Sequence, residues 1–227
     1  MKFQHLIFPA LMALAGLLTG CEKDNYAEPK ATISGRVVYQ NQPIGVRSNG
    51  VQLELWQRGY QLFTKIPVYV DQDGSFSATV FDGNYKLVRL RGNGPWVDNT
   101  DTIDVQVRGS ATIDVPVQPY FTVANEKFQK AGTAITSTCK INQVLTTRAI
   151  ERVTLYVGST QFVDINNNAG NVSKAGADLA DLTKELSFTM NIPSSVASKA
   201  YVYGRIGVKT VGVAEMLYSP VQKIQLK

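Results

Sequence analysis

A tryptophan surrounded by polar residues is the pattern with the clearest capacity for chemistry. Trp96 lies near Arg91, Asp98 and Asn99 in a segment rich in glycine and proline. An aromatic ring can stack on the apolar face of a pyranose, and such polar side chains can hydrogen-bond the sugar hydroxyls. Glycine and proline predict a loop, where binding residues are often found. We therefore interpret these four residues as a sugar-binding site; the alternative is a tryptophan that fills a loop or seals two domains together.

A second aromatic pair gives another candidate platform. Trp56 shares the polar face of its predicted strand with Gln52 and Glu54, and Tyr60 follows on the C-terminal side. Alternate residues of a strand point to the same face, so Trp56 is predicted to point away from the core. Trp56 and Tyr60 are therefore predicted to bind ligand, with cover of a sheet edge or an interdomain contact as the alternative.

The scarcity of reactive side chains argues against an enzyme. His5 is the only histidine, and it lies in an N-terminal segment that we expect to be removed. A mature chain without histidine has no Ser-His-Asp or Cys-His catalysis and no His-ligated metal. Cys139 has no catalytic partner beside it in the sequence and is interpreted as a small buried hydrophobe.

The charge balance argues against a nucleic-acid partner, and the spacing of residues in one polar loop argues against bound calcium. Lys plus Arg number 23 against 18 Asp plus Glu, a net charge of +5 without a run of like charges, which argues against nucleic acid. The segment 164–170 contains the oxygen ligands of a calcium loop, but its glycine is misplaced and Ala175 stands where a bidentate Glu is needed. We expect a polar turn there, and neither a metal nor a cofactor.

The N-terminal segment has the features of a secretion signal. Residues 1–20 carry Lys2 and then an apolar run, Leu6 to Leu18, which is shorter than the roughly 20 residues of a membrane span and typical of a signal peptide. Leu18-Thr19-Gly20-Cys21 resembles the bacterial lipobox, whose cysteine receives a diacylglycerol on its thiol and an acyl chain on its freed amine. Lipidation of Cys21 is therefore predicted to anchor the chain to a membrane.

Residues 21–29 form a polar tether that ends at Pro29. Its Glu22-Lys23-Asp24 stretch resembles the charged surface-export signals of Bacteroidetes lipoproteins. We therefore expect the protein on the outer membrane, facing the cell exterior.

The rest of the chain alternates with the period of two that is typical of strands. Val51, Leu53 and Leu55, for example, alternate with polar residues. The segments 102–105 and 112–115 both read Thr-Ile-Asp-Val, and they are predicted to pair as a hairpin. Short strands separated by turns indicate a β-sandwich.

A second series of strands follows a proline-rich boundary at Val115-Pro-Val-Gln-Pro119. The expected strands are Thr133 to Ile141, Glu151 to Val157, Leu186 to Ile192, Tyr201 to Lys209 and Met216 to Leu226. No segment has the pattern of a long helix. The predicted fold is all-β: two consecutive β-sandwich domains, residues 30–118 and an Ig-like 119–227, after the signal peptide and short tether.

Two resemblances agree with this organisation. Ile33-x-Gly35-x-Val37, Asp73-Gly74-x-Phe76 and Gly83-x-Tyr85-x-Leu87 resemble the carboxypeptidase-regulatory-like, transthyretin-type sandwich. The mature chain as a whole resembles a Bacteroidetes lipoprotein family that carries a domain of unknown function. The residues that carry this second resemblance are Gly94-Pro95-Trp96 to Pro119-Tyr120-Phe121, Tyr203 to Val208, and Tyr218-Ser219.

The second resemblance implies a role in glycan capture. Members of that family are usually encoded in polysaccharide-utilisation loci, beside a TonB-dependent transporter and a starch-binding-like lipoprotein. We therefore expect a non-catalytic surface lipoprotein that binds polysaccharide or oligosaccharide and works with those two partners. The alternative is a structural or adhesin-type lipoprotein that binds proteins. Glycan binding predicts an exposed Trp96, whereas the alternative predicts a buried Trp96 with an apolar patch or an unpaired edge strand.

Overall fold

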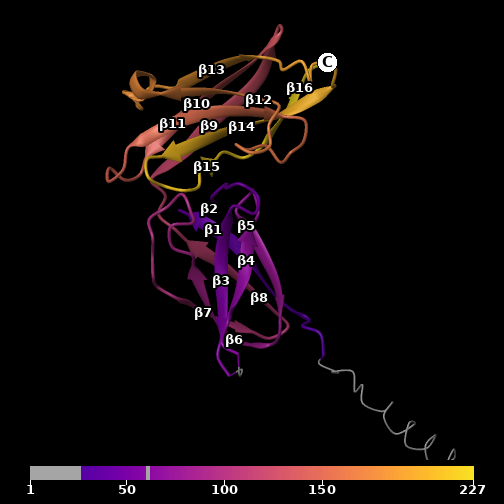
Figure 1. Cartoon of the computed structure of the whole chain (residues 1–227), viewed down its shortest axis with the longest axis vertical. Helices are drawn as coiled ribbons and strands as arrows, with labels where there is room; N and C mark the ends of the chain where they lie inside the picture. Colours follow the sequence, from indigo (N-terminus) through magenta and orange to yellow (C-terminus); the bar gives the residue numbers. More distant parts are fainter. Residues whose placement is uncertain (1–26, 60–61) are drawn as a thin grey trace, which may run out of the picture.

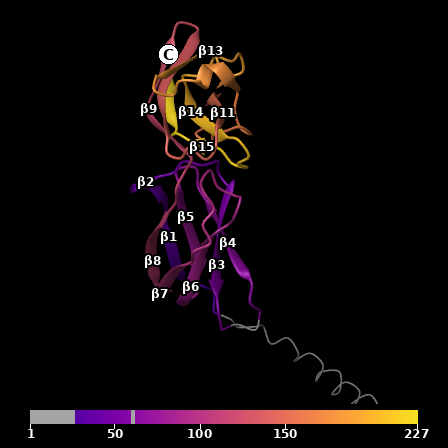
Figure 2. The same ribbon diagram turned by 90° about the vertical axis from the view of Figure 1, so that its left-hand side faces the viewer.

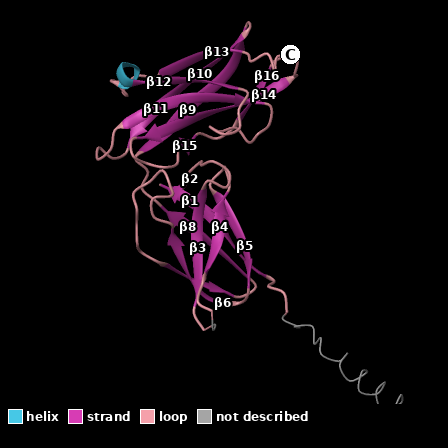
Figure 3. Cartoon of the chain, in the orientation of Figure 1, coloured by secondary structure: helices cyan, strands magenta, loops and turns pink. Residues whose placement is uncertain are grey.

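The structure is a computed structural model that describes residues 27–59 and 62–227. Its described part consists of strands and loops, with a single short 3-10 turn, η2, at Gly176–Leu179 (Figure 3). None of the described helical segments is long and apolar enough to cross a membrane. The all-β prediction is confirmed.

The first domain is one sheet that curls around a single apolar core. Its strands are β1 (Ala31–Tyr39), β2 (Gln42–Pro43), β3 (Val51–Gln57), β4 (Lys65–Val70), β5 (Ser75–Val80), β6 (Gly83–Arg89), β7 (Ile103–Val107) and β8 (Ser110–Pro116). They follow the order β2-β1-β5-β4-β3-β6-β7, and β8 pairs with the free side of β1. In β3 the predicted inward residues Val51, Leu53 and Leu55 are buried, but Glu54 on the predicted polar face is buried as well.

Strand β1 explains one glycine of the sandwich motif. It pairs antiparallel with β5 and parallel with β8, and Gly35 lies opposite Phe76 on one side and Ile113 on the other. A Cβ at Gly35 would lie 1.7 Å from the carbonyl oxygen of Ile113. No side chain fits there, so this glycine permits the close approach of two strands.

The predicted hairpin between the two Thr-Ile-Asp-Val segments is wrong. A tight turn at Arg108 and Gly109 joins β7 to β8, but β7 pairs with β6, whereas β8 pairs with β1. The two strands therefore pass from one side of the sandwich to the other instead of pairing together. Their inward residues are as predicted, because Val105 and Val115 are buried.

The second domain packs two sheets against each other. Its strands are β9 (Phe121–Ala131), β10 (Ala134–Gln143), β11 (Ile150–Gly158), β12 (Gly170–Ala175), β13 (Leu186–Asn191), β14 (Tyr201–Thr210), β15 (Leu217–Tyr218) and β16 (Gln222–Gln225). One sheet has the order β13-β10-β9, and the other has β12-β11-β14-β15 with β16 also paired to β14. The five expected strands are present, although the last is divided into β15 and β16; β9 and β12 were not predicted.

The second domain lies across the end of the first, opposite the end where the N-terminal segment enters (Figures 1 and 2). The second domain also has a small apolar cluster separate from its main core, Tyr156, Val163, Met216 and Tyr218, and Tyr218 forms a bridge with Gly45 of the first domain. This junction places side chains from both domains around one space.

Candidate functional site

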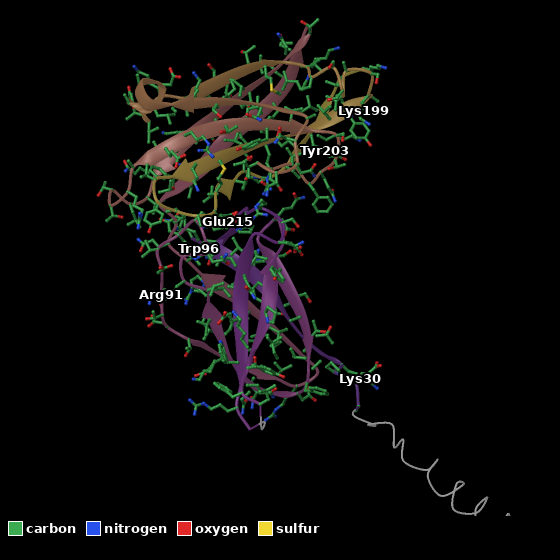
Figure 4. All side chains as sticks on the ribbon, viewed as in Figure 1. Lys30, Arg91, Trp96, Lys199, Tyr203 and Glu215 are labelled. Carbon is green, nitrogen blue, oxygen red and sulfur yellow. The ribbon has the colours of Figure 1, made fainter. Side chains whose placement is uncertain are left out.

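Trp96 is buried, which corrects the prediction of an exposed platform. Its exposed fraction is 5%, and it belongs to the core of the first domain. It forms an isolated bridge with Pro119, and Figure 4 shows it close to the junction. A Cβ at Gly94 would lie 2.1 Å from the indole ring, so the glycine of Gly94-Pro95-Trp96 lets the ring fold back against the chain. A ring in this position offers no face to a sugar.

The polar neighbours of Trp96 are exposed but engaged within their own loop. Asp98 Oδ1 accepts a hydrogen bond from the backbone N–H of Gly92 at 2.7 Å, and Arg91 Nε lies 4.0 Å from Asp98 Oδ2. Asn99 Oδ1 accepts from the backbone N–H of Asp101 at 2.6 Å. Asp98 and Asn99 line a shallow hollow that contains no aromatic ring. Arg91, Asp98 and Asn99 as ligand-binding residues stay a prediction.

Trp56 lies at the opposite end of the first domain. It is half-buried, and its ring centroid lies 5.1 Å from that of Phe63. Its indole N–H donates to Glu54 Oε2 at 3.2 Å, and Lys65 Nζ lies 2.6 Å from Glu54 Oε1. Trp56 is thus the remaining predicted platform in the described chain; Tyr60 and Cys21, the other predicted residues, lie outside the described residues.

A cavity of about 490 Å³ lies at the junction of the two domains. The first domain contributes the β1–β2 turn and the β4–β5 turn, with Tyr39, Gln40, Gln42, Gln72 and Asp73. The second domain contributes Thr122, Val123, Arg205 and the chain from Leu217 to Val221. Its volume is within the range of about 300–1,000 Å³ that is usual for small-molecule sites, which often lie between domains.

Arg205 forms the floor of this junction. It is 1% exposed, its Nε donates to the carbonyl of Ser219 at 2.8 Å, and its Nη2 donates to the carbonyl of Gln72 at 2.5 Å. Its guanidinium carbon lies 4.7 Å from the centre of the Tyr218 ring, a cation–π contact. Burial lowers the pKa of Arg205 to about 10, so the group remains charged at neutral pH.

Three further hydrogen bonds join the two domains. The backbone N–H of Tyr218 donates to the carbonyl of Gly45 at 2.9 Å. Arg47 and Glu215 form an ion pair through two hydrogen bonds, of 3.3 and 2.7 Å. The cavity walls therefore come from two domains that these contacts join, and the buried Nη1 of Arg205 has no hydrogen-bond partner among the described residues.

The cavity offers the groups that a neutral sugar needs. Tyr39 provides an aromatic ring, and its hydroxyl accepts a hydrogen bond from Gln40 Nε2 at 3.3 Å. Gln42 adds an exposed amide. Asp73 adds a carboxylate whose Oδ1 accepts hydrogen bonds from the backbone N–H and the hydroxyl of Ser75, and these bonds hold its pKa below the usual value.

The β1–β2 turn at this site has a recognisable sequence pattern. Gln40 and Asn41 have φ angles of 50° and 64°, so the amide-rich segment Gln40-Asn41-Gln42 forms a tight turn. Such a turn next to an aromatic strand end marks a loop with binding capacity, but its partner residues are distant in the chain.

Two other predictions concern polar and reactive groups. Cys139 is a free, fully buried thiol, as predicted, and burial raises its pKa to about 12. Asp164 forms the predicted polar turn, because its Oδ1 accepts from the backbone N–H groups of Asn166 and Asn167 at 2.7 and 3.0 Å. Across residues 27–59 and 62–227, no three His, Cys, Asp or Glu side chains gather as a metal site requires.

Comparison with known proteins identifies relatives along nearly the whole described chain. The crystal structure of a DUF3823 family protein from Bacteroides ovatus ATCC 8483 is 39% identical, covers 87% of this chain and all of that chain, and has a TM-score of 0.82. A DUF3823 family protein from Parabacteroides merdae ATCC 43184 is 33% identical, covering 88% of this chain and 100% of that chain, with a TM-score of 0.80. No curated protein matches the chain.

A third solved structure shares the fold at lower identity. It is described as a candidate carbohydrate-binding protein from Bacteroides uniformis ATCC 8492, is 20% identical over 88% of this chain and 100% of that chain, and has a TM-score of 0.71. Residues 31–118 match the N-terminal domain of the protein family of unknown function DUF3823, and residues 121–223 match the domain of unknown function DUF3823_C. The chain therefore belongs to the DUF3823 family.

Proposed function

We propose that this protein is a non-catalytic, lipid-anchored protein of the outer membrane that binds polysaccharide or oligosaccharide in the cavity between its two domains. The observation that carries the proposal is the cavity itself, about 490 Å³, with the Tyr39 ring and the Gln42 amide at its wall. A chain end or side branch of a glycan is the ligand that matches an aromatic ring bordered by amides and one carboxylate.

The proposed anchor is the lipidated Cys21, which follows the lipobox residues Leu18-Thr19-Gly20. The charged tether directs the protein to the cell exterior, where a TonB-dependent transporter and a starch-binding-like lipoprotein are its proposed partners. Many copies held on one membrane raise the effective concentration, so weak binding at each cavity suffices to retain a polymer. The structure described as a candidate carbohydrate-binding protein has the same fold, which agrees with this role.

Affinity electrophoresis tests the proposal directly. The mature chain with Cys21→Ser would be run in gels that contain plant, host or microbial polysaccharides. Tyr39→Ala and Gln42→Ala would run in parallel, with Tyr69→Ala as the matched control, because Tyr69 is an exposed tyrosine of the same domain outside the cavity. We expect one polysaccharide to retard the parent and the control but not the two cavity variants.

Other outcomes would revise the proposal. Retardation that persists in the cavity variants but disappears in Trp56→Ala would move the glycan site to the opposite end of the first domain. No retardation on any gel would contradict glycan binding.

A second candidate function is the binding of protein partners at the cell surface. The burial of Trp96 is the observation that favours it, because that hypothesis expected this tryptophan inside the molecule. Chemical cross-linking on intact cells tests it: a defined protein partner, together with the absence of glycan binding, would establish this alternative.

A further inference from the structure

Three large apolar side chains are exposed at one end of the first domain. Leu62 is 77% exposed and Phe63 is 54% exposed, both between β3 and β4, and Phe81, between β5 and β6, is 41% exposed. Soluble domains rarely place such side chains together without a partner.

Strand pairing brings this apolar end next to the entry of the chain. Ala31, the first residue of β1, pairs with Val80, which directly precedes Phe81. Trp56 pairs with Lys65, so the loop that carries Leu62 and Phe63 closes at the same end. Figure 4 places Lys30 at this end, away from the second domain.

Basic side chains border the apolar residues. Lys30, Arg58 and Arg108 are exposed, and the guanidinium carbon of Arg58 lies 6.0 Å from the centre of the Phe63 ring. Two acids lie at this end as well: Glu28 is exposed two residues before Lys30, and Asp82 accepts a hydrogen bond from the backbone N–H of Gly109 at 2.6 Å. Apolar side chains bordered by lysine and arginine are typical of surfaces that lie in the interface of a bilayer.

The length of the tether keeps this end close to a membrane. The predicted anchor Cys21 is ten residues before Ala31, and ten extended residues span at most about 35 Å. Attachment through Cys21 exposes the apolar end to a high local concentration of lipid. Weak insertion is therefore sufficient to keep this end in contact with the bilayer.

We propose that this end of the first domain lies on the lipid bilayer, with Leu62, Phe63 and Phe81 inserted between acyl chains. The inference rests on the proposed lipid anchor. The contact fixes the orientation of the molecule: the first domain stands on the membrane, and the interdomain cavity opens one domain length above it. The contact with the bilayer would orient the molecule whatever ligand the cavity binds.

The two tryptophans provide built-in probes of depth. Trp56 lies beside Phe63 at the apolar end, whereas Trp96 is buried near the interdomain junction. The full acylated chain would be reconstituted into phosphatidylcholine and phosphatidylglycerol vesicles with brominated acyl chains, which quench tryptophan fluorescence on contact. Trp96→Phe leaves Trp56 as the sole reporter, and Trp56→Phe leaves Trp96.

We expect brominated lipid to quench Trp56 at least three-fold more strongly than Trp96. Leu62→Ser with Phe63→Ser in the Trp96→Phe background should remove more than half of the Trp56 quenching. Val211→Ser is the matched control, because Val211 is an apolar residue of the second domain that is 47% exposed. Circular dichroism would check that each variant is folded.

Co-flotation of the chain with the vesicles separates the anchor from the contact. The membrane contact would be refuted, and the anchor left intact, if the chain floats but Trp56 is not quenched. The same conclusion would follow if Trp56 is quenched equally with and without the two serine substitutions. A chain that does not float would refute the anchor and this inference with it. If the serine variants instead lose retardation by polysaccharide, the apolar end is part of a glycan site, and the inference is also wrong.

Discussion

Replacement of Arg205 by methionine tests whether one buried guanidinium holds the two domains together. The substitution removes two charged hydrogen bonds, to the carbonyls of Ser219 and Gln72, each worth about 1.5–3 kcal/mol. It also removes the cost of a buried cation, because burial lowers the pKa of Arg205 to about 10, a shift that corresponds to about 3 kcal/mol. The carbonyl of Ser219 then loses its donor. We expect a net loss of about 2 kcal/mol in the free energy of unfolding.

Urea denaturation would measure this loss. Tryptophan fluorescence reports the first domain, because both tryptophans lie there, and far-ultraviolet circular dichroism reports both domains. We expect the unfolding transitions followed by the two signals to coincide in the parent. They should separate in Arg205→Met, because the contact between the domains is weakened and each domain unfolds on its own. Arg108→Met, at an exposed turn residue, is the matched control. An ordinary surface substitution changes the free energy of unfolding by about 0.5 kcal/mol or less. A change no larger than this in Arg205→Met, with coincident transitions, would refute the role of Arg205 in holding the domains together.

The remaining predictions concern two buried side chains and one glycine at a close contact between strands. Trp96→Ala should lower the free energy of unfolding by about 3–5 kcal/mol in thermal denaturation, because a large ring leaves the core; a loss below about 1 kcal/mol would mean that the ring is exposed in solution. Gly35→Ala should cost about 3 kcal/mol in urea denaturation or prevent folding, because its Cβ meets the Ile113 carbonyl, whereas Thr112→Ala on the same ladder should be mild. Cys139, whose pKa rises from 9.0 to about 12 in the folded state, should make unfolding easier as pH rises from about 9 to about 12, by about 1 kcal/mol at pH 10. Cys139→Ala should remove that part of the pH dependence, and an unchanged profile would contradict the assigned burial.

Local alternation was sufficient to predict the strands that have one buried face. Strand β13 shows why: Leu186 and Phe188 are buried, and the exposed Ser187 lies between them. Strand β12 was missed because it is an edge strand without a fully buried side chain. Strand β9 was missed because most of its residues are exposed or half-buried, which leaves no clear period in the sequence.

Pairing and burial depended on contacts that no local pattern contains. The two Thr-Ile-Asp-Val segments are joined by the turn of a hairpin, but β7 pairs with β6, the strand before it, and β8 pairs with β1, which lies far away in the sequence. Trp96 follows Gly94 and Pro95, which correctly predict a loop, yet contact with Pro119 and space above Gly94 bury the ring. The interdomain cavity was missed for the same reason, because Tyr39, Asp73 and Arg205 meet only when both domains are folded.

The parallel pairing of β1 with β8 has a mechanical consequence. Both strands run from the end where the chain enters the first domain toward the second domain. Under the proposed function, a bound polymer pulled away from the cell would load the start of β1 through the proposed anchor and the end of β8 through the second domain. The two strands are then drawn past each other along their length, so their ladder, from Thr32–Ser110 to Val38–Pro116, resists in shear and breaks together rather than one bond at a time. Because forced rupture depends on the rate of unfolding, this geometry favours a protein that stays folded under tension.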